Sequence, residues 1–319
     1  MLRCLAFLTG AALAAPVFAE APRLALPIDC TLGDTCYIQN YVDRDSAAET
    51  DADFMCQDLT YDGHKGTDFA LPSLADMQKG VDVLASASGV VRGTRDEMPD
   101  TGLSSDVDGR ECGNGVLLDH GDGWQTQYCH MKLGSVTVHK GDRVKAGGVL
   151  GQVGYSGKTE FPHVHLSLRH NGEVVDPFEP KASAECGSQS IPLWTTDIGY
   201  QAGGLIQLGF SSHLPSFEAV KSGTAHEPEM DSTASAVVIW GYVFGTRHGD
   251  VLELTINGPE GLNFTHKALF KKEQALAYRA AGKKLNAETW PAGVYKGQVR
   301  FIRQGKSIGE QSVTMTVAP

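Results

Sequence analysis

Two histidines are spaced so that they share one face of a predicted β-strand. Residues 161–169 read Phe-Pro-His-Val-His-Leu-Ser-Leu-Arg, in which polar residues alternate with aliphatic ones. Successive side chains of a strand point to opposite faces, so His163 and His165 lie together on the face that is not buried. Two imidazoles at this spacing can bind one metal ion or one substrate. Taken alone, such a pair is more often only a feature of a solvated strand face.

Two further clusters lie upstream in the chain. His64 and Asp68 are four residues apart on an extended segment, where Gly63 and Gly66 let the backbone pass close to a ligand. A neutral imidazole and a carboxylate together suit Zn2+, although this cluster alone fits a surface turn equally well. In residues 126–130 we expect Tyr128 and His130 to project together from a hairpin strand. The other seven histidines are expected at the surface: His120, His139, His170, His213, His226, His248 and His266.

Short strands joined by tight turns must position these clusters. The chain contains 37 Gly and 14 Pro among short runs of aliphatic residues, which predicts a mainly β protein. Between residues 61 and 180 the strands include a hairpin that turns at residues 120–123, and residues 93–113 form a long polar loop. Regular strand signals across residues 236–319 indicate a small β-sandwich.

The three clusters together are far more specific than any one of them. His64-x3-Asp68, Tyr128-x-His130 and Pro162-His163-x-His165, in this order and among glycine-rich strands, closely resemble the LytM/lysostaphin-type zinc endopeptidases, which cut peptidoglycan cross-links. The resemblance covers about residues 61–180. It extends to several glycine-rich stretches, namely residues 113–115, 120–123, 140–144 and 151–157.

The resemblance implies a fold and a set of roles. The fold would be a glycine-rich antiparallel β domain of the barrel-sandwich type. His64, Asp68 and His165 would bind one Zn2+ per chain, which leaves a fourth position for water. His130 and His163 would be the catalytic pair, one accepting a proton from that water and the other stabilising the charge that develops. The sequence leaves open which histidine does which.

Some features depart from the family pattern. Phe161, Val164 and Leu166 stand where the family commonly has Gly, Leu and Phe, and the loop at residues 93–113 is longer than the family minimum. In some relatives an upstream Asn occupies the open zinc position and keeps the enzyme latent. Asn40 is a conceivable equivalent, although an Asn in a loop usually only turns the chain.

Charge and the N-terminus indicate the compartment. Lys and Arg total 27 against 38 Asp and Glu, a net charge of -11 without any basic run, which argues against nucleic acid as a partner. Residues 1–19 have the pattern of a signal peptide cleaved after Ala19. A membrane anchor is the rival interpretation, but the apolar run is shorter than the about 20 residues needed to span a bilayer. We therefore expect an exported protein, periplasmic or secreted, with no integral membrane segment after cleavage.

The cysteines divide the chain into a disulfide-containing part and a cysteine-free part. Cys4 would leave with the signal peptide, and the remaining six all lie at or before Cys186. An even number in an exported protein indicates disulfides, and Cys30 and Cys36 are close enough to form one. The predicted layout is a signal peptide at 1–19, an N-terminal extension at 20–60, a catalytic domain at 61–180, a connecting region at 181–235 and the β-sandwich at 236–319.

These observations favour an exported zinc endopeptidase acting on peptide cross-links of peptidoglycan. The alternative is a non-catalytic regulator that activates a cell-wall amidase, because some members of the family have lost zinc ligands. A biotinyl or lipoyl carrier domain with Lys132 as the modified residue fits the strand texture but conflicts with export. In the C-terminal part, Trp240, Tyr242, Trp290 and Tyr295 are candidates for sugar stacking, although aromatic residues in predicted strands are more often core.

Overall fold

The computed structural model describes residues 20–45, 47, 49–103, 107–181, 185–187 and 190–318. The predicted signal peptide and Cys4 lie outside the described residues. Among those that are described, no helix has the length and apolar character needed to cross a membrane.

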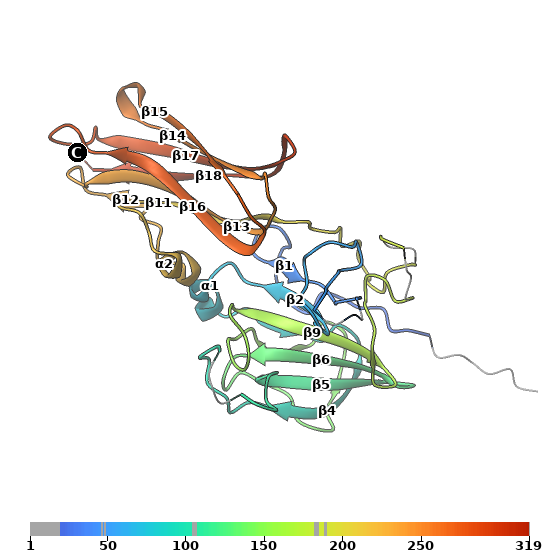
Figure 1. The fold of residues 1–319 in the computed structure, drawn as a ribbon. Helices are drawn as coiled ribbons and strands as arrows, with labels where there is room; N and C mark the ends of the chain where they lie inside the picture. The colour runs from blue at the N-terminus through green and yellow to red at the C-terminus, as the bar shows by residue number, and fades with distance from the viewer. Residues whose placement is uncertain are drawn as a thin grey trace, which may run out of the picture.

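An antiparallel sheet forms the first half of the structure (Figure 1). Its strand order is β1-β2-β9-β6-β5-β4-β7, and β10 pairs with the end of β9. The strands are β1 (Tyr37–Asn40), β2 (Thr67–Ala70), β4 (Gly89–Arg95), β5 (Asn114–Gly121), β6 (Trp124–Met131), β7 (Arg143–Val144), β9 (His163–His170) and β10 (Glu173–Val174). A separate ladder pairs β3 (Asp82–Leu84) with β8 (Val149–Gln152). The loop after β4 begins at Asp96, because β4 continues to Arg95.

Side-chain alternation on the central strands separates a core face from a polar face. Val164, Leu166 and Leu168 of β9 are at most 1% exposed and pack into the main hydrophobic core. The polar residues between them point to the opposite face, as the sequence predicted. We call this opposite face of β2, β9, β6, β5 and β4 the site face.

The C-terminal half is a β-sandwich of two sheets. One sheet has the order β11-β13-β16 and the other β12-β18-β17-β14-β15. The elements are β11 (Gly204–Ser211), β12 (Glu229–Met230), β13 (Ala236–Thr246), β14 (Val251–Asn257), η1 (Pro259–Gly261), β15 (Asn263–Leu269), β16 (Gln274–Lys284), β17 (Gly293–Arg303) and β18 (Lys306–Val317). The prediction of a mainly antiparallel β protein ending in a β-sandwich is confirmed.

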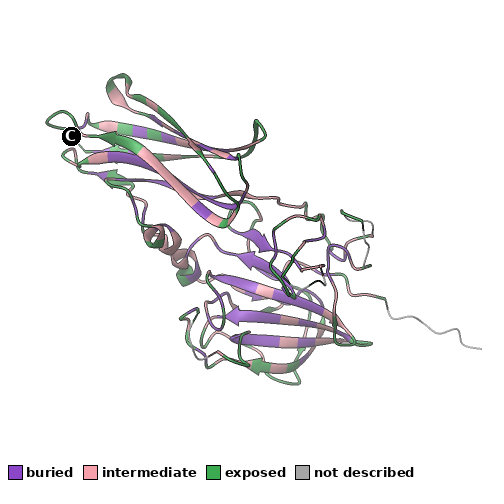
Figure 2. Ribbon diagram, viewed as in Figure 1, coloured by how far each residue is buried: buried purple, intermediate pink, exposed green. Residues whose placement is uncertain are grey.

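The two halves pack directly against each other. The hydrophobic core of the first half includes Trp240, Tyr242 and Phe244 of β13, and the rings of Phe244 and Tyr37 lie 4.7 Å apart. Figure 2 shows the buried strands that meet there. Trp240, Tyr242, Trp290 and Tyr295 are all at most 7% exposed, so they are core residues and cannot stack on a sugar.

Two short helices add to this junction. Helix α1 (Leu74–Lys79) begins at Ser73, whose side chain accepts a hydrogen bond from the Asp76 amide, and ends at Gly80. Helix α2 (Phe217–Ser222) begins in the same way at Ser216 and ends at Gly223. The two helices contact each other, so each half of the protein contributes one helix to the junction.

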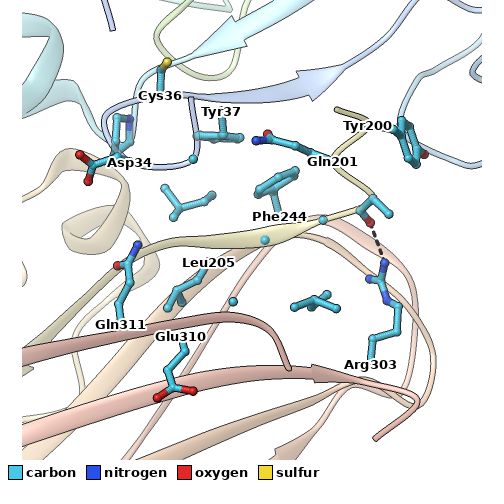
Figure 3. A pocket seen from close by; sticks show the side chains of 18 of the residues that line it. Asp34, Cys36, Tyr37, Tyr200, Gln201, Leu205, Phe244, Arg303, Glu310 and Gln311 are labelled. Atoms are coloured by element: carbon cyan, nitrogen blue, oxygen red, sulfur yellow. Dashed lines mark hydrogen bonds between the residues drawn. The ribbon is translucent and has the colours of Figure 1, made fainter. Parts of the chain in front are cut away.

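A cavity of about 550 Å³ lies between the N-terminal segment and the β-sandwich (Figure 3). Tyr37, Leu205 and Phe244 give it an apolar wall. Arg303 closes one end, where its guanidinium donates to the carbonyl of Ala202 and forms an ion pair with Asp250 at 2.7 Å. None of the five residues predicted to do chemistry lines this cavity.

Candidate metal centre and catalytic histidines

One row of residues crosses four neighbouring strands and organises the site. Asn40 of β1 lies opposite Asp68 of β2, Asp68 opposite His165 of β9, and His165 opposite Cys129 of β6. His163 follows on the site face of β9. His64 comes from the loop before β2. Residues that are up to 125 positions apart in the chain are thereby placed side by side.

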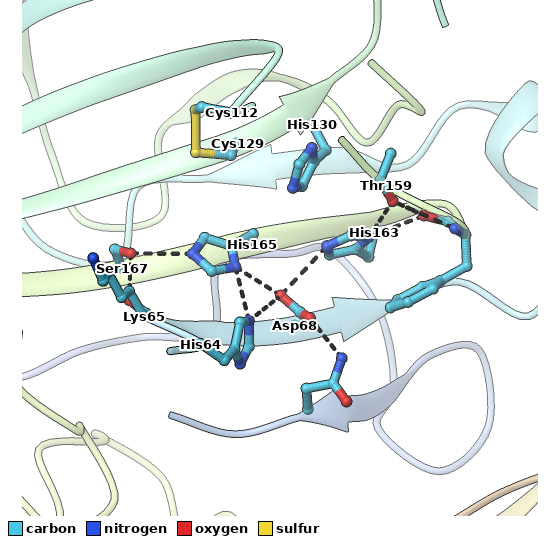
Figure 4. A network of polar contacts seen from close by, with 12 residues as sticks. His64, Lys65, Asp68, Cys112, Cys129, His130, Thr159, His163, His165 and Ser167 are labelled. Atoms are coloured by element: carbon cyan, nitrogen blue, oxygen red, sulfur yellow. Dashed lines mark hydrogen bonds and ion pairs between the residues drawn. A yellow bond between two sulfur atoms is a disulfide. The ribbon is translucent and has the colours of Figure 1, made fainter. Parts of the chain in front are cut away.

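His64, Asp68 and His165 converge on one point. Each offers one ligand atom, and these atoms lie within 4.8 Å of one another. Asp68 Oδ1 is 3.2 Å from His64 Nε2 and 2.8 Å from His165 Nδ1 (Figure 4). Two imidazole nitrogens and one carboxylate oxygen suit Zn2+. The structure thus brings together the three residues that the sequence predicted as ligands.

Each of these groups is oriented by a further hydrogen bond. His64 Nδ1 donates to the carbonyl of Tyr41 at 2.6 Å, which leaves Nε2 directed at the centre. His165 Nε2 lies 3.1 Å from Ser167 Oγ, and Ser167 donates to the carbonyl of Lys65. Such outer partners fix the orientation and tautomer of metal-binding histidines. No sequence pattern pointed to Tyr41, whereas Ser167 could have been found as the next site-face residue after His165.

Asn40 lies behind Asp68. Its amide Nδ2 donates to Asp68 Oδ2 at 2.8 Å, whereas the histidines contact the other carboxylate oxygen. Asn40 is 8% exposed and belongs to the edge strand β1. This arrangement differs from the conceivable role of Asn40 as a residue in the open zinc position, because the amide supports a ligand from outside.

Gly66 permits the close approach of the loop before β2. A Cβ atom on Gly66 would lie 2.5 Å from Nε2 of His165 and 2.7 Å from the carbonyl of Leu166. Any larger residue would therefore displace the ring of a predicted ligand. The presence of glycine at position 66 is therefore explained by the space that the ring of His165 needs.

His130 and His163 face the same centre from the other side. Their rings lie 4.6 Å apart, and His163 Nε2 is 3.3 Å from Asp68 Oδ1. His130 Nδ1 donates to the carbonyl of Ser156 at 2.8 Å, and His163 Nδ1 donates to the carbonyl of Phe161 at 2.9 Å. Since Nδ1 is the donor in each ring, Nε2 faces the centre, and the Nε2 atom of a neutral imidazole can accept a proton.

The prediction that Tyr128 and His130 project together is wrong. Tyr128 is fully buried on the core face, where its hydroxyl accepts a hydrogen bond from the Ser86 amide at 2.7 Å. His130 has φ +61°, in the left-handed region, which turns its side chain away from the core face that regular alternation would give it. The positive φ therefore places His130 on the site face.

The electrostatics of the site favour a neutral His130 and an ionised Asp68. Burial, with His163 and His165 nearby, lowers the pKa of His130 well below its usual range. Burial alone would raise the pKa of Asp68, but His64 and His163 hold it well below its usual range. Burial also lowers the pKa of His165, an effect that Asp68 partly offsets. All three groups are then in the protonation states that metal binding and proton acceptance require.

Comparison with known proteins identifies the domain that carries this site. The sequence pattern of peptidase family M23 matches residues 62–177. Residues 62–177 belong to peptidase family M23. The predicted resemblance to LytM-type enzymes is confirmed, and the M23 domain contains all five residues of the site.

The relatives differ in what they are named for. The peptidoglycan DD-endopeptidase ShyA of Vibrio cholerae is 33% identical over 124 residues, which is 38% of this chain and 24% of that protein. The cell division protein DipM of Caulobacter vibrioides is 34% identical over 102 residues, 32% of this chain and 15% of that protein. The catalytic domain of the M23 protein EnpA from Enterococcus faecalis is 26% identical, with a TM-score of 0.32 over 49% of this chain and 94% of that structure. The matched region thus spans about a quarter of the length of ShyA and a smaller share of the length of DipM.

Proposed function

We propose that this protein is a zinc-dependent endopeptidase that hydrolyses peptide cross-links of bacterial peptidoglycan. The observation that carries the proposal is the complete constellation of three converging ligand groups with two further histidines, each presenting Nε2 to the same centre. The similarity to ShyA supports peptidoglycan as the substrate class. A structural zinc site would be closed by a fourth protein ligand, whereas this set leaves one position open.

The roles of the side chains follow from their hydrogen bonds. His64, Asp68 and His165 would hold the zinc ion, which when bound supplies a Lewis acid that polarises the scissile carbonyl and lowers the pKa of a water molecule. His130 and His163 each donate from Nδ1 to a backbone carbonyl, which directs Nε2 at the centre. One accepts the proton of the attacking water, and the other donates a hydrogen bond to the oxygen on which negative charge develops. The second role requires that ring to be protonated at Nε2.

We also propose that the protein is exported to the periplasm or secreted. Three disulfides support this: Cys30–Cys36, Cys56–Cys186 and Cys112–Cys129. The first is the pair expected from the sequence. Disulfides persist in oxidising compartments and are rare in the cytosol, and peptidoglycan lies outside the cytoplasmic membrane.

The test uses the chain from residue 20 onward and its His165→Ala variant. Each is incubated first with zinc and then with purified cross-linked peptidoglycan, and the release of uncross-linked muropeptides is followed. We expect release by the native protein only. A zinc-loaded native protein that releases no muropeptides would overturn the proposal.

The alternative function is a non-catalytic activator of a cell-wall amidase. The observation that supports this alternative is the similarity to DipM, which is named as a cell division protein. The same incubation with a peptidoglycan amidase added distinguishes the two functions. If the protein is a regulator, the native chain and His130→Ala should accelerate the amidase to the same extent. If it is an endopeptidase, His130→Ala should lose the release of uncross-linked muropeptides.

A further inference from the structure

The Cys112–Cys129 disulfide lies directly beside the catalytic pair. Cys129 is opposite His165 in the sheet and immediately precedes His130. The disulfide joins the end of β6 to Cys112 in the loop before β5, with a Cα–Cα distance of 4.8 Å. Figure 4 shows it above the ring of His165 and next to His130. It thus ends the row of residues that begins at Asn40.

His130 needs external support to keep its orientation. A φ of +61° is a conformation that a residue with a side chain adopts at a cost, so it persists only where surrounding contacts enforce it. Relaxation of this backbone to an ordinary strand conformation would turn the imidazole toward the core face. The Nε2 atom of His130 would then leave the centre that it shares with His163.

The Cys112 segment supplies that support. The backbone amide of His130 donates to the carbonyl of Cys112 at 2.8 Å. The carbonyl that accepts from the His130 ring belongs to Ser156, and Ser156 Oγ in turn accepts from the amide of Asn114 at 2.9 Å. Gly113, with φ +65°, packs so closely that a Cβ atom there would lie 2.4 Å from the carbonyl oxygen of Ser156. The backbone and the ring of His130 are therefore both held by residues 112–114.

The metal ligands are supported from elsewhere. His64 is held by Tyr41, Asp68 by Asn40, and His165 by Ser167. None of these hydrogen bonds involves residues 111–114. Loss of the disulfide should therefore affect His130 and spare the three ligands.

We propose that the Cys112–Cys129 disulfide is a positioning element for His130, and that the protein becomes catalytically competent only when this disulfide has formed. The proposal rests on the proposed endopeptidase function. Oxidation follows thiol–disulfide exchange: the two thiols pass two electrons and two protons to a disulfide donor, which leaves as a dithiol while the Sγ–Sγ bond forms. The enzyme would thus be held inactive in a reducing cytosol and activated on export.

The other two disulfides provide matched controls. The three bridges span 6, 17 and 130 residues, for Cys30–Cys36, Cys112–Cys129 and Cys56–Cys186 respectively. Because a disulfide restricts the unfolded chain more strongly when it closes a longer loop, removal of Cys56–Cys186 should lower Tm the most. A purely structural role of all three predicts that activity falls in the same order.

The experiment compares three paired variants with the native chain from residue 20: Cys30→Ala/Cys36→Ala, Cys56→Ala/Cys186→Ala and Cys112→Ala/Cys129→Ala. Zinc content, Tm, kcat and KM for a cross-linked muropeptide are measured for each. We expect Cys112→Ala/Cys129→Ala to keep its zinc and lose on the order of 100-fold in kcat with little change in KM. The Cys56→Ala/Cys186→Ala variant should keep its kcat at temperatures where it is folded, despite its lower Tm. Equal kcat in all folded variants, or a loss that follows the order of Tm, would overturn the proposal.

A second readout does not depend on cleavage. In the native protein, ¹⁵N NMR of the imidazoles should show His130 as the Nδ1–H tautomer, and removal of the disulfide should give a mixture of tautomers. If the native protein binds zinc but cleaves nothing, the proposed function fails while this comparison still decides the positioning role. An unchanged tautomer in Cys112→Ala/Cys129→Ala would refute it. Gly113→Ala, which disturbs the same segment with the disulfide intact, should reproduce the loss of kcat if the paired variant does not fold.

Discussion

The hydrogen bond from Asn40 to Asp68 should contribute directly to zinc affinity. It is buried, measures 2.8 Å, and ends on the carboxylate oxygen that faces away from the histidines. A hydrogen bond to a charged group contributes about 1.5–3 kcal/mol. At about 1.4 kcal/mol for each tenfold change, Asn40→Ala should weaken zinc binding by about 10- to 100-fold. The same range is typical of outer-shell partners of metal ligands.

The neighbouring residue offers a matched control. Gln39 is also a buried amide on β1, but its Nε2 donates to the carbonyl of Ala275 in the β-sandwich at 3.2 Å. Gln39→Ala should therefore lower Tm without changing the zinc dissociation constant. Both variants are titrated at pH 7 against a chromophoric zinc chelator, so that affinity is measured independently of cleavage.

The outcome also tests whether Asn40 keeps the enzyme latent. If Asn40 occupied the open zinc position, Asn40→Ala would cleave faster than the native protein once both are saturated with zinc. We predict instead that Asn40→Ala cleaves no faster. Equal zinc affinity of Asn40→Ala and Gln39→Ala would refute the supporting role that we assign to the hydrogen bond.

Three further perturbations have expected outcomes. Burial raises the pKa of Asp176 to about 7, so the folded chain retains a proton that the unfolded chain loses above its ordinary pKa of 3.8. The free energy of unfolding is therefore highest below pH about 4 and declines as the pH rises to about 7. Urea unfolding should show that Asp176→Asn removes this decline, which amounts to up to about 4 kcal/mol at pH 8. Arg303→Ala leaves the buried Asp250 without its guanidinium partner and should destabilise the fold by about 3–5 kcal/mol. A thermal unfolding curve that matches that of the native protein would contradict this contribution of the ion pair. Ser167→Ala removes the hydrogen bond to His165 Nε2 and should weaken zinc binding by about tenfold, whereas an unchanged chelator titration would show that the ring needs no such partner.

The sequence predicted those parts of the site that depend on local periodicity. Alternation along residues 163–169 is a property of any strand, and it correctly placed His163 and His165 opposite the aliphatic core residues. The spacing of His64 and Asp68 likewise predicted two groups that converge. The structure brings these four residues and His130 together, while their individual roles remain predictions.

Other features depend on contacts that no local pattern encodes. The positive φ of His130 depends on hydrogen bonds to Cys112 and Ser156, so alternation alone wrongly grouped it with Tyr128. Asn40 reaches Asp68 only because β1 pairs with β2 across 28 residues of sequence. The pairing of Cys30 with Cys36 follows from their short separation, whereas the other two disulfides require the folded sheet.

The C-terminal half shows the same limit. Strand β16 (Gln274–Lys284) has four alanines and three lysines or arginines, a composition with low strand propensity, and it was not predicted. It forms because its backbone pairs along nearly the whole of β13 and its alternate side chains fill the junction between the two halves. Tertiary contacts outweigh propensity at this position.

The most direct test of the central claim separates metal ligands from catalytic histidines. Zinc content and muropeptide release are measured together for the native chain from residue 20, for His64→Ala and for His130→Ala. We predict about one zinc per chain in the native protein and in His130→Ala, no zinc in His64→Ala, and muropeptide release by the native protein alone. A His130→Ala variant that lost its zinc, or one that still cleaved at the native rate, would contradict the roles assigned to these residues.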